Sequence, residues 1–191
     1  MGIMIALPCH GGIVNEKTTM SLFNLGKLLV RNNIPHGLLT QANSSLITHG
    51  RSKCANFFIN NTDHEYLFFL DSDIGFDPED VLKLLSHNEP IVSGTYPMKT
   101  IPIRYCVDVL EPEERRGNLL KVGGNGMGFV MIHRSVFTDI AQKFPYLKYI
   151  PSTKDSNYPP TEAEMNNSYH YFAEEKIDDS FASEDKSFFY R

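Results

Sequence analysis

The continuous apolar run 66–70 limits more than any other feature how this chain can fold. Five consecutive apolar residues that end at an acid fit a strand buried on both faces, the environment of a central strand in a parallel sheet. Similar short runs alternate with segments of helical spacing. The expected strands are 2–7, 36–40, 66–70, 90–94 and one after the glycine-rich stretch 123–132, and the expected helices are 17–32, 46–60, 77–87 and 135–143. This alternation predicts an α/β fold with a mostly parallel central sheet and helices on both faces.

Three further segments receive weaker predictions. Residues 105–110 are expected to form an edge strand, and 146–168, rich in Pro, Ser, Asn and Tyr, are expected to be a loop. Residues 183–191 read as the start of a helix. Because the chain stops just inside that helix, we expect one domain over 1–191 that is cut from a longer polypeptide.

The size, charge and apolar pattern of the chain exclude several classes of function. Its 191 residues and 41% hydrophobic content fit one globular domain, and its net charge of −5 argues against a nucleic-acid binder, which needs a basic face. No apolar run reaches membrane-spanning length, and 3–7 is too short for a secretory signal. Three scattered cysteines form no CxxC motif. We therefore expect a cytoplasmic protein with no nucleic-acid partner and no membrane span.

Two acids, Asp71 and Asp73, follow the central run with one residue between them. Ligands of open α/β sheets bind at the carboxyl ends of strands. Carboxylates this close repel each other unless a cation lies between them, and Mg²⁺ or Mn²⁺ is typically held by one or two carboxylates together with substrate phosphates. The plainer alternative is a solvated strand end, with Asp77 capping the next helix. We expect Asp73 to bind a metal, and Asp71 to contact a ribose or to reach the metal through water.

Five segments in this order resemble the motifs of GT-A fold glycosyltransferases, which use nucleotide sugars and have a Rossmann-like sheet. They are IALPCHGG, THGRSKCANFF, FFLDSDIGFDPEDVLKLL, GGNGMGFVMIHRSVF and SEDKSFFYR. The resemblance implies a metal-dependent, inverting transfer of a sugar from a nucleotide-diphosphate sugar to a glycan or glycoprotein acceptor. It favours a UDP-sugar as donor and Mn²⁺ or Mg²⁺ as cofactor.

The strand ends and the resemblance together define a candidate site. Asp185 is the expected catalytic base, with Glu184 as the alternate, although both are also typical acids for the first turn of a helix capped by Ser183. Family members often have a further metal-binding His after this pair, and none follows it here. His170 is the candidate substitute, although a His flanked by aromatic residues on a strand is more often simply packed. The expected nucleotide and donor contacts are Pro8, Cys9, His10, Gly11, Gln41, Arg51, Asp71, Ser72, Lys99, Gly124 and Gly126.

Two other functions stay open. A nucleotidyltransferase that makes nucleotide sugars also uses metal-binding acids, but it usually has a Gly-rich signature with Arg and Lys after the first strand. The segment PCHGGIVN contains neither Arg nor Lys. A non-catalytic sugar-binding module needs no metal pair.

Overall fold

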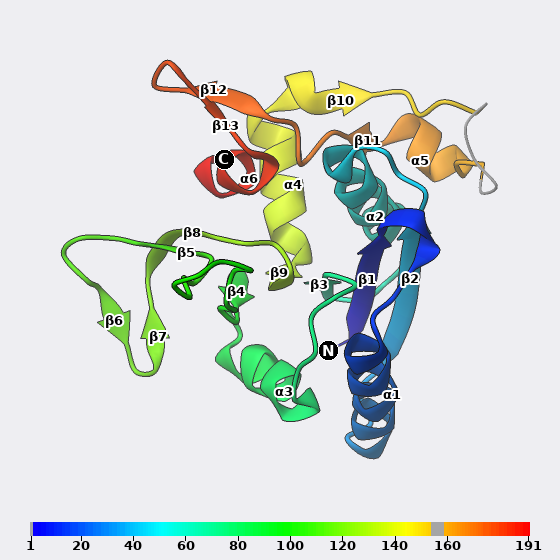
Figure 1. The fold of residues 1–191 in the computed structure, drawn as a ribbon. Coiled ribbons are helices and arrows are strands. Elements are labelled where there is room, and N and C mark those ends of the chain that lie inside the picture. The colour runs from blue at the N-terminus through cyan, green and yellow to red at the C-terminus, as the bar shows by residue number, and fades with distance from the viewer. Residues whose placement is uncertain (1, 154–158) are drawn as a thin grey trace.

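The central sheet of the protein has five strands in the order β2-β1-β3-β9-β4 (Figure 1). The structure is a computed structural model, and it describes residues 2–153 and 159–191. The strands of the sheet are β1 (Ile3–Cys9), β2 (His36–Ala42), β3 (Tyr66–Leu70), β4 (Ile91–Ser93) and β9 (Phe129–His133). β1 runs parallel to both β2 and β3, whereas β9 runs antiparallel to β3 and β4. The predicted mostly parallel, Rossmann-like sheet is confirmed, with β9 as its one reversed strand.

Helices cover both faces of this sheet. α1 (Glu16–Arg31) and α3 (Pro78–His87) pack on one face, and α2 (Ile47–Asn61), α4 (Arg134–Lys143) and α6 (Glu184–Tyr190) pack on the other. β3 supplies Phe68 to the first layer and Phe69 to the second, because alternate residues of a strand point to opposite faces. All five residues of β3 are buried, which confirms the prediction of a central strand.

Local cap chemistry sets where two helices begin. The Asn15 side chain accepts a hydrogen bond from the Lys17 N–H at the start of α1. The Asp77 side chain accepts one from the Glu79 N–H, with Pro78 as the first residue of α3. The helix expected over 77–87 therefore begins one residue later, and Asp77 is its cap.

The segment between β4 and β9 differs from the prediction. β5 (Val107–Val109) pairs with β8 (Val122–Asn125), so 105–110 contains a strand of a separate two-stranded sheet and not an edge of the central one. The first part of the glycine-rich stretch therefore belongs to strand β8. The sequence did not predict this strand, because glycines have no side chains to form an alternating pattern. β6 (Arg115–Arg116) and β7 (Leu119–Leu120) form a hairpin that projects from the body (Figure 1).

The prediction that the whole segment 146–168 is a loop is wrong. It contains β10 (Lys148–Tyr149), α5 (Glu162–Asn166) and the start of β11 (Ser168–Tyr169), and residues 154–158 lie outside the described part. A capping box at the start of α5 explains why so short a helix forms. The remaining elements are two 3-10 turns, η1 (His10–Gly12) and η2 (Pro145–Leu147), and a hairpin of β12 (Glu175–Ile177) and β13 (Ser180–Ala182). In the described ranges, no helix has the length and apolarity needed to cross a bilayer.

Candidate active site

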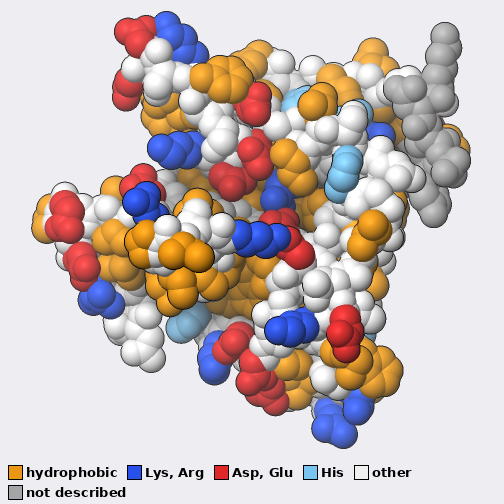
Figure 2. All heavy atoms as spheres, viewed as in Figure 1, with side chains coloured by type: hydrophobic (Ala, Val, Ile, Leu, Met, Phe, Trp, Pro, Cys, Tyr) orange, Lys and Arg blue, Asp and Glu red, His pale blue; other side chains and the backbone are white. Residues whose placement is uncertain are grey.

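The carboxyl ends of β1, β2 and β3 bring most of the predicted nucleotide contacts to one edge of the sheet. Pro8 of β1 lies opposite Gln41 of β2, and the Asn15 N–H donates to the Ser72 carbonyl, 2.8 Å away. Gly11 has a positive φ of 66°, and a Cβ built there would meet no atom within 4 Å. The turn after β1 therefore presents open backbone beside the loop that contains Ser72. Figure 2 shows acidic and basic side chains interspersed over the viewed face of the molecule.

Arg51 is the centre of this edge. Its side chain extends from the first turns of α2, and the residue is only 4% exposed. Its Nη2 lies 3.1 Å from Asp71 Oδ1 and its Nη1 donates to the Met127 carbonyl at 3.3 Å. The guanidinium also lies 5.7 Å from the centre of the Phe69 ring. Arg51 thus fixes the orientation of the Asp71 carboxylate at the end of β3.

Glycines let the turn between β8 and β9 approach Asp71 closely. A Cβ on Gly128 would lie 2.6 Å from Asp71 Oδ2 and 2.7 Å from Tyr96 Oη, and a Cβ on Gly126 would collide with Tyr96 and Cys106. The Gly128 N–H donates to Tyr96 Oη at 3.0 Å, and burial raises the pKa of Tyr96, so its hydroxyl stays protonated. Sequence reasoning missed Tyr96 and Gly128, because only folding brings them to Asp71.

Asp185, the predicted base, lies in the first turn of α6 and close to Arg51. Burial, with a smaller contribution from Glu184, raises the pKa of Asp185 to about 7, against the opposing effects of Arg51 and of a hydrogen bond from the Met127 backbone. Among the described residues, Asp185 Oδ1 is buried without a hydrogen-bond partner. Ser183 makes no side-chain capping bond to α6. The environment of Asp185 is therefore that of a carboxylate that can gain and lose a proton near neutral pH.

This pKa makes the stability of the fold depend on pH. The folded pKa of Asp185 lies above its ordinary value of 3.8, so between about pH 4 and 7 the folded state holds a proton that the unfolded state releases. The contribution of Asp185 to the free energy of unfolding is therefore fully present below about pH 4 and is lost as the pH rises to about 7. We expect Asp185→Asn to raise the melting temperature more at pH 8 than at pH 5. A pH series of melting curves tests this, with Asp179→Asn, at a 93% exposed side chain, as control. A pH-independent difference would contradict the assignment.

Asp73 forms an ion pair with Lys99. Lys99 Nζ lies 2.5 Å from Asp73 Oδ2, and this hydrogen bond raises the pKa of Lys99. Both side chains are largely exposed, so the pair is weak and can open. No group of three His, Cys, Asp or Glu side chains that could hold a metal occurs in the described part of the chain. The role of Asp73 as a metal ligand therefore stays a prediction.

His170 lies against α2. Its ring packs near His49 and Tyr149, and its Nδ1 is 3.5 Å from Ser52 Oγ. Burial lowers the pKa of His170, which favours the neutral imidazole that a metal requires. Its role as a metal ligand stays a prediction.

The other predicted contacts have simple environments. Cys9 is buried and burial raises its pKa, so the thiol stays protonated and is no nucleophile. His10 is exposed at the start of η1. A Cβ on Gly124 would lie 3.7 Å from the Phe189 side chain, which places this glycine against α6 and not in open space.

Comparison with known proteins supports the fold alone. No protein-family model and no curated protein matches the chain. Among solved structures, A197 from STIV is 25% identical, with a TM-score of 0.50 over 73% of this chain and 69% of that one. The 4-diphosphocytidyl-2C-methyl-D-erythritol synthase from Anaerococcus prevotii is 9% identical, with a TM-score of 0.44 over 81% and 80% of the two chains. The first likeness agrees with the Rossmann-like α/β architecture, and the second is too weak to carry an argument.

Proposed function

We propose that this chain is a GT-A type glycosyltransferase that moves a sugar from a UDP-sugar to a hydroxyl of a glycan or glycoprotein, with inversion and with Mn²⁺ or Mg²⁺ as cofactor. The observation that carries this proposal is the position of Arg51 between two acids. It is ion-paired with Asp71 at the end of β3 and lies close to Asp185, whose pKa is raised to about 7. Two acids in different environments at one strand edge support two roles, one toward the donor and one toward the acceptor.

The donor half of the reaction is assigned to the edge formed by β1, β2 and β3. Gly11 presents open backbone for a nucleotide, and Asp71 is held in one orientation by Arg51. Asp73 and Lys99 would meet the diphosphate, with Asp73 and His170 as the candidate metal ligands. A bound Mn²⁺ or Mg²⁺ supplies charge stabilisation to the UDP leaving group. When the donor binds, Lys99 exchanges the Asp73 carboxylate for a phosphate oxygen.

The acceptor half is assigned to Asp185. The acceptor hydroxyl gives its proton to the Asp185 carboxylate while its oxygen bonds to the anomeric carbon. The bond from that carbon to the phosphate oxygen breaks, and UDP leaves with the electron pair. Because attack and departure occur on opposite faces, one displacement inverts the configuration. A base with a pKa near 7 is well matched to this proton transfer at neutral pH.

A calorimetric titration with UDP tests the donor site. We expect UDP to bind at least tenfold more tightly with Mn²⁺ than with a chelator, and Asp73→Asn to abolish the difference, because Asp73 is the exposed carboxylate at this edge. Asp80→Asn is the matched control, since Asp80 also pairs with an exposed lysine but lies on α3. Equal affinities with metal and chelator would contradict the metal site.

The two alternatives give different results. A nucleotidyltransferase would release pyrophosphate from UTP and a sugar 1-phosphate. A sugar-binding module would bind free sugar and show no effect of Mn²⁺ or of Asp73→Asn.

We further propose that this transfer serves viral protein glycosylation in the cytoplasm of a host cell, of the kind expected for a chlorella-virus glycosyltransferase that acts on capsid glycans.

A further inference from the structure

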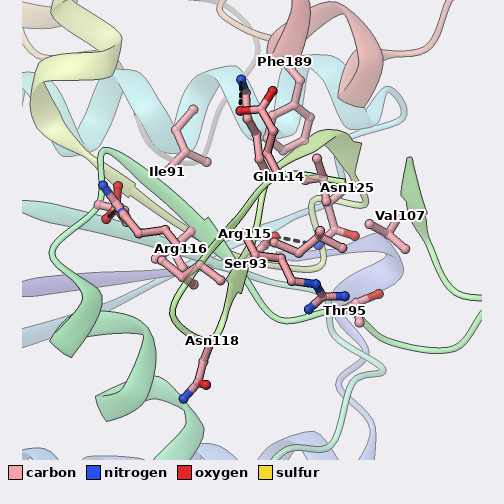
Figure 3. Close-up of a pocket in the computed structure, with 16 residues that line it drawn as sticks. Ile91, Ser93, Thr95, Val107, Glu114, Arg115, Arg116, Asn118, Asn125 and Phe189 are labelled. Carbon is pink, nitrogen blue, oxygen red and sulfur yellow. Dashed lines mark hydrogen bonds and ion pairs between the residues drawn. The ribbon is translucent and has the colours of Figure 1, made fainter. Parts of the chain in front are cut away.

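A cavity of about 730 Å³ lies along the free edge of β4, outside the nucleotide edge described above (Figure 3). β4 forms one wall, the β6–β7 hairpin another, and β5, β8 and Phe189 of α6 complete it. The volume is within the range of sites that bind ligands.

Among the described residues, no strand pairs with β4 on the side of this cavity. The His133 N–H donates to the Pro90 carbonyl and the Gly94 N–H donates to the Phe129 carbonyl, at 2.8 and 3.1 Å. In an antiparallel ladder alternate residues bond to the partner strand, so the N–H and C=O groups of Ile91, Ser93 and Thr95 point away from β9. β4 is the last strand of the sheet, and these three residues line the cavity.

One side-chain oxygen in the cavity is also left without a donor. Asn125 is only 6% exposed, and its Nδ2 donates to Ser93 Oγ at 2.7 Å, as Figure 3 shows. Its Oδ1 is buried and has no hydrogen-bond partner among the described residues. A buried acceptor left unpaired destabilises a protein, so a donor N–H from an occupant would relieve this.

The charges around the cavity do not favour a phosphorylated ligand. Each basic side chain of its lining is held by an acid: Arg115 by Glu113, Arg116 by Glu89, and Lys121 by Glu114. Much of the remaining lining is apolar, with Ile91, Val107, Leu119 and Phe189 among the residues. An occupant with a row of backbone donors and acceptors and uncharged side chains fits these walls.

We propose that the cavity binds an extended polypeptide segment, which adds to β4 as a sixth strand of the central sheet. Exposed strand edges bind peptides in this way, through backbone hydrogen bonds. The cavity and the candidate base share α6: Phe189 lines the cavity and follows Asp185 by four residues, so both lie on the same helix face. That the segment belongs to the polypeptide carrying the acceptor rests on the proposed function; the binding itself does not.

Backbone methylation of a probe peptide tests strand addition without changing the protein. The probe is a fluorescein-labelled eight-residue peptide of alternating Thr and Val, measured by anisotropy without UDP or metal. N-methylation of alternate residues leaves one hydrogen-bonding edge free, and we expect this peptide to bind within about threefold of the parent. N-methylation of every residue blocks both edges, and we expect at least tenfold weaker binding. Equal binding of the two methylated peptides, or no binding of the parent at 1 mM, overturns the proposal.

A pair of variants locates the binding at β4. Ser93→Pro removes the N–H that points into the cavity, and Pro is tolerated at a sheet edge in this orientation. Ser93→Ala also loses the contact with Asn125 but keeps the N–H. We expect the Pro variant to bind the parent peptide at least tenfold more weakly than the Ala variant, with equal melting temperatures showing that both are folded. If the Pro variant unfolds, the methylated peptides still decide the question.

Two further measurements separate this proposal from the proposed function. Binding of maltoheptaose together with failure of the parent peptide would make the cavity a glycan site and overturn strand addition. UDP affinity of the same variants is expected to be unchanged. If the native protein fails to bind the parent peptide but binds UDP, only strand addition is contradicted. If the native protein binds the peptide but not UDP, only the proposed transfer is contradicted.

Discussion

Asp185→Asn is expected to lower the rate of sugar transfer by about 10²- to 10⁴-fold while leaving the affinity for UDP nearly unchanged, because a positioned general base contributes about that much. An amide of the same shape cannot accept the acceptor's proton. The measurement pairs transfer rates with calorimetric UDP affinity for both proteins. Glu184→Gln is the control on the adjacent residue and is expected to have a much smaller effect, since Asp185 is the acid beside Arg51.

The pH dependence of kcat/KM for the native protein is a second test of Asp185 as the base. Only the deprotonated carboxylate acts as base, so kcat/KM should rise with pH and level off above about 7, the pKa of Asp185. Full transfer by Asp185→Asn would remove this residue from the mechanism. Loss of UDP binding together with activity would instead assign Asp185 to the donor or metal site.

Arg51→Ala is expected to destabilise the fold by about 2–3 kcal/mol, less than for a fully buried ion pair, because the Asp71 carboxylate that loses its partner is 31% exposed. Three groups lose a cationic neighbour: the Asp71 carboxylate, the Met127 carbonyl and, at longer range, Asp185. Urea unfolding measures the change. Arg115→Ala is the matched control, since its ion pair with Glu113 is exposed and is worth at most about 1 kcal/mol. Equal losses in the two variants would mean that the partly buried pair of Arg51 and Asp71 contributes little.

Arg51 also affects the acid beside it. The guanidinium lowers the pKa of Asp185, so a folded Arg51→Lys variant, in which the charge is displaced, should show its kcat/KM rise at a higher pH than the native protein. An unchanged pH profile would contradict the electrostatic link between Arg51 and Asp185.

Local signals explain which parts of the fold could be predicted from the sequence. The strand at 66–70 and the start of α3 agree with prediction because a continuous apolar run and an Asp-Pro cap act within a few residues. The direction of β9 could not be predicted, because it depends on strands far away in the sequence. β8 was hidden by its glycines, and α5 by its five-residue length.

The same distinction holds in the candidate site. Asp71, Arg51 and Asp185 were each identified from their own segments, but the contact of Arg51 with Asp71 joins residues that are 20 positions apart and emerges only in the fold. Tyr96 lies beside Gly128 although 32 positions separate them, and nothing around either residue indicates this. The contact of Arg51 with a nucleotide stays a prediction: the arginine is only 4% exposed, and the carboxylate that it contacts is that of Asp71.

The most direct test of the account is the anomeric configuration of the sugar that the enzyme releases when water replaces the acceptor. Proton NMR follows UDP-glucose, UDP-galactose and UDP-N-acetylglucosamine, all α-linked, with Mn²⁺ and the native protein. We expect slow release of UDP together with the β-anomer of one of these sugars, and neither product with chelator or with Asp185→Asn. Release of the α-anomer, or cleavage to UMP and a sugar 1-phosphate, would contradict it.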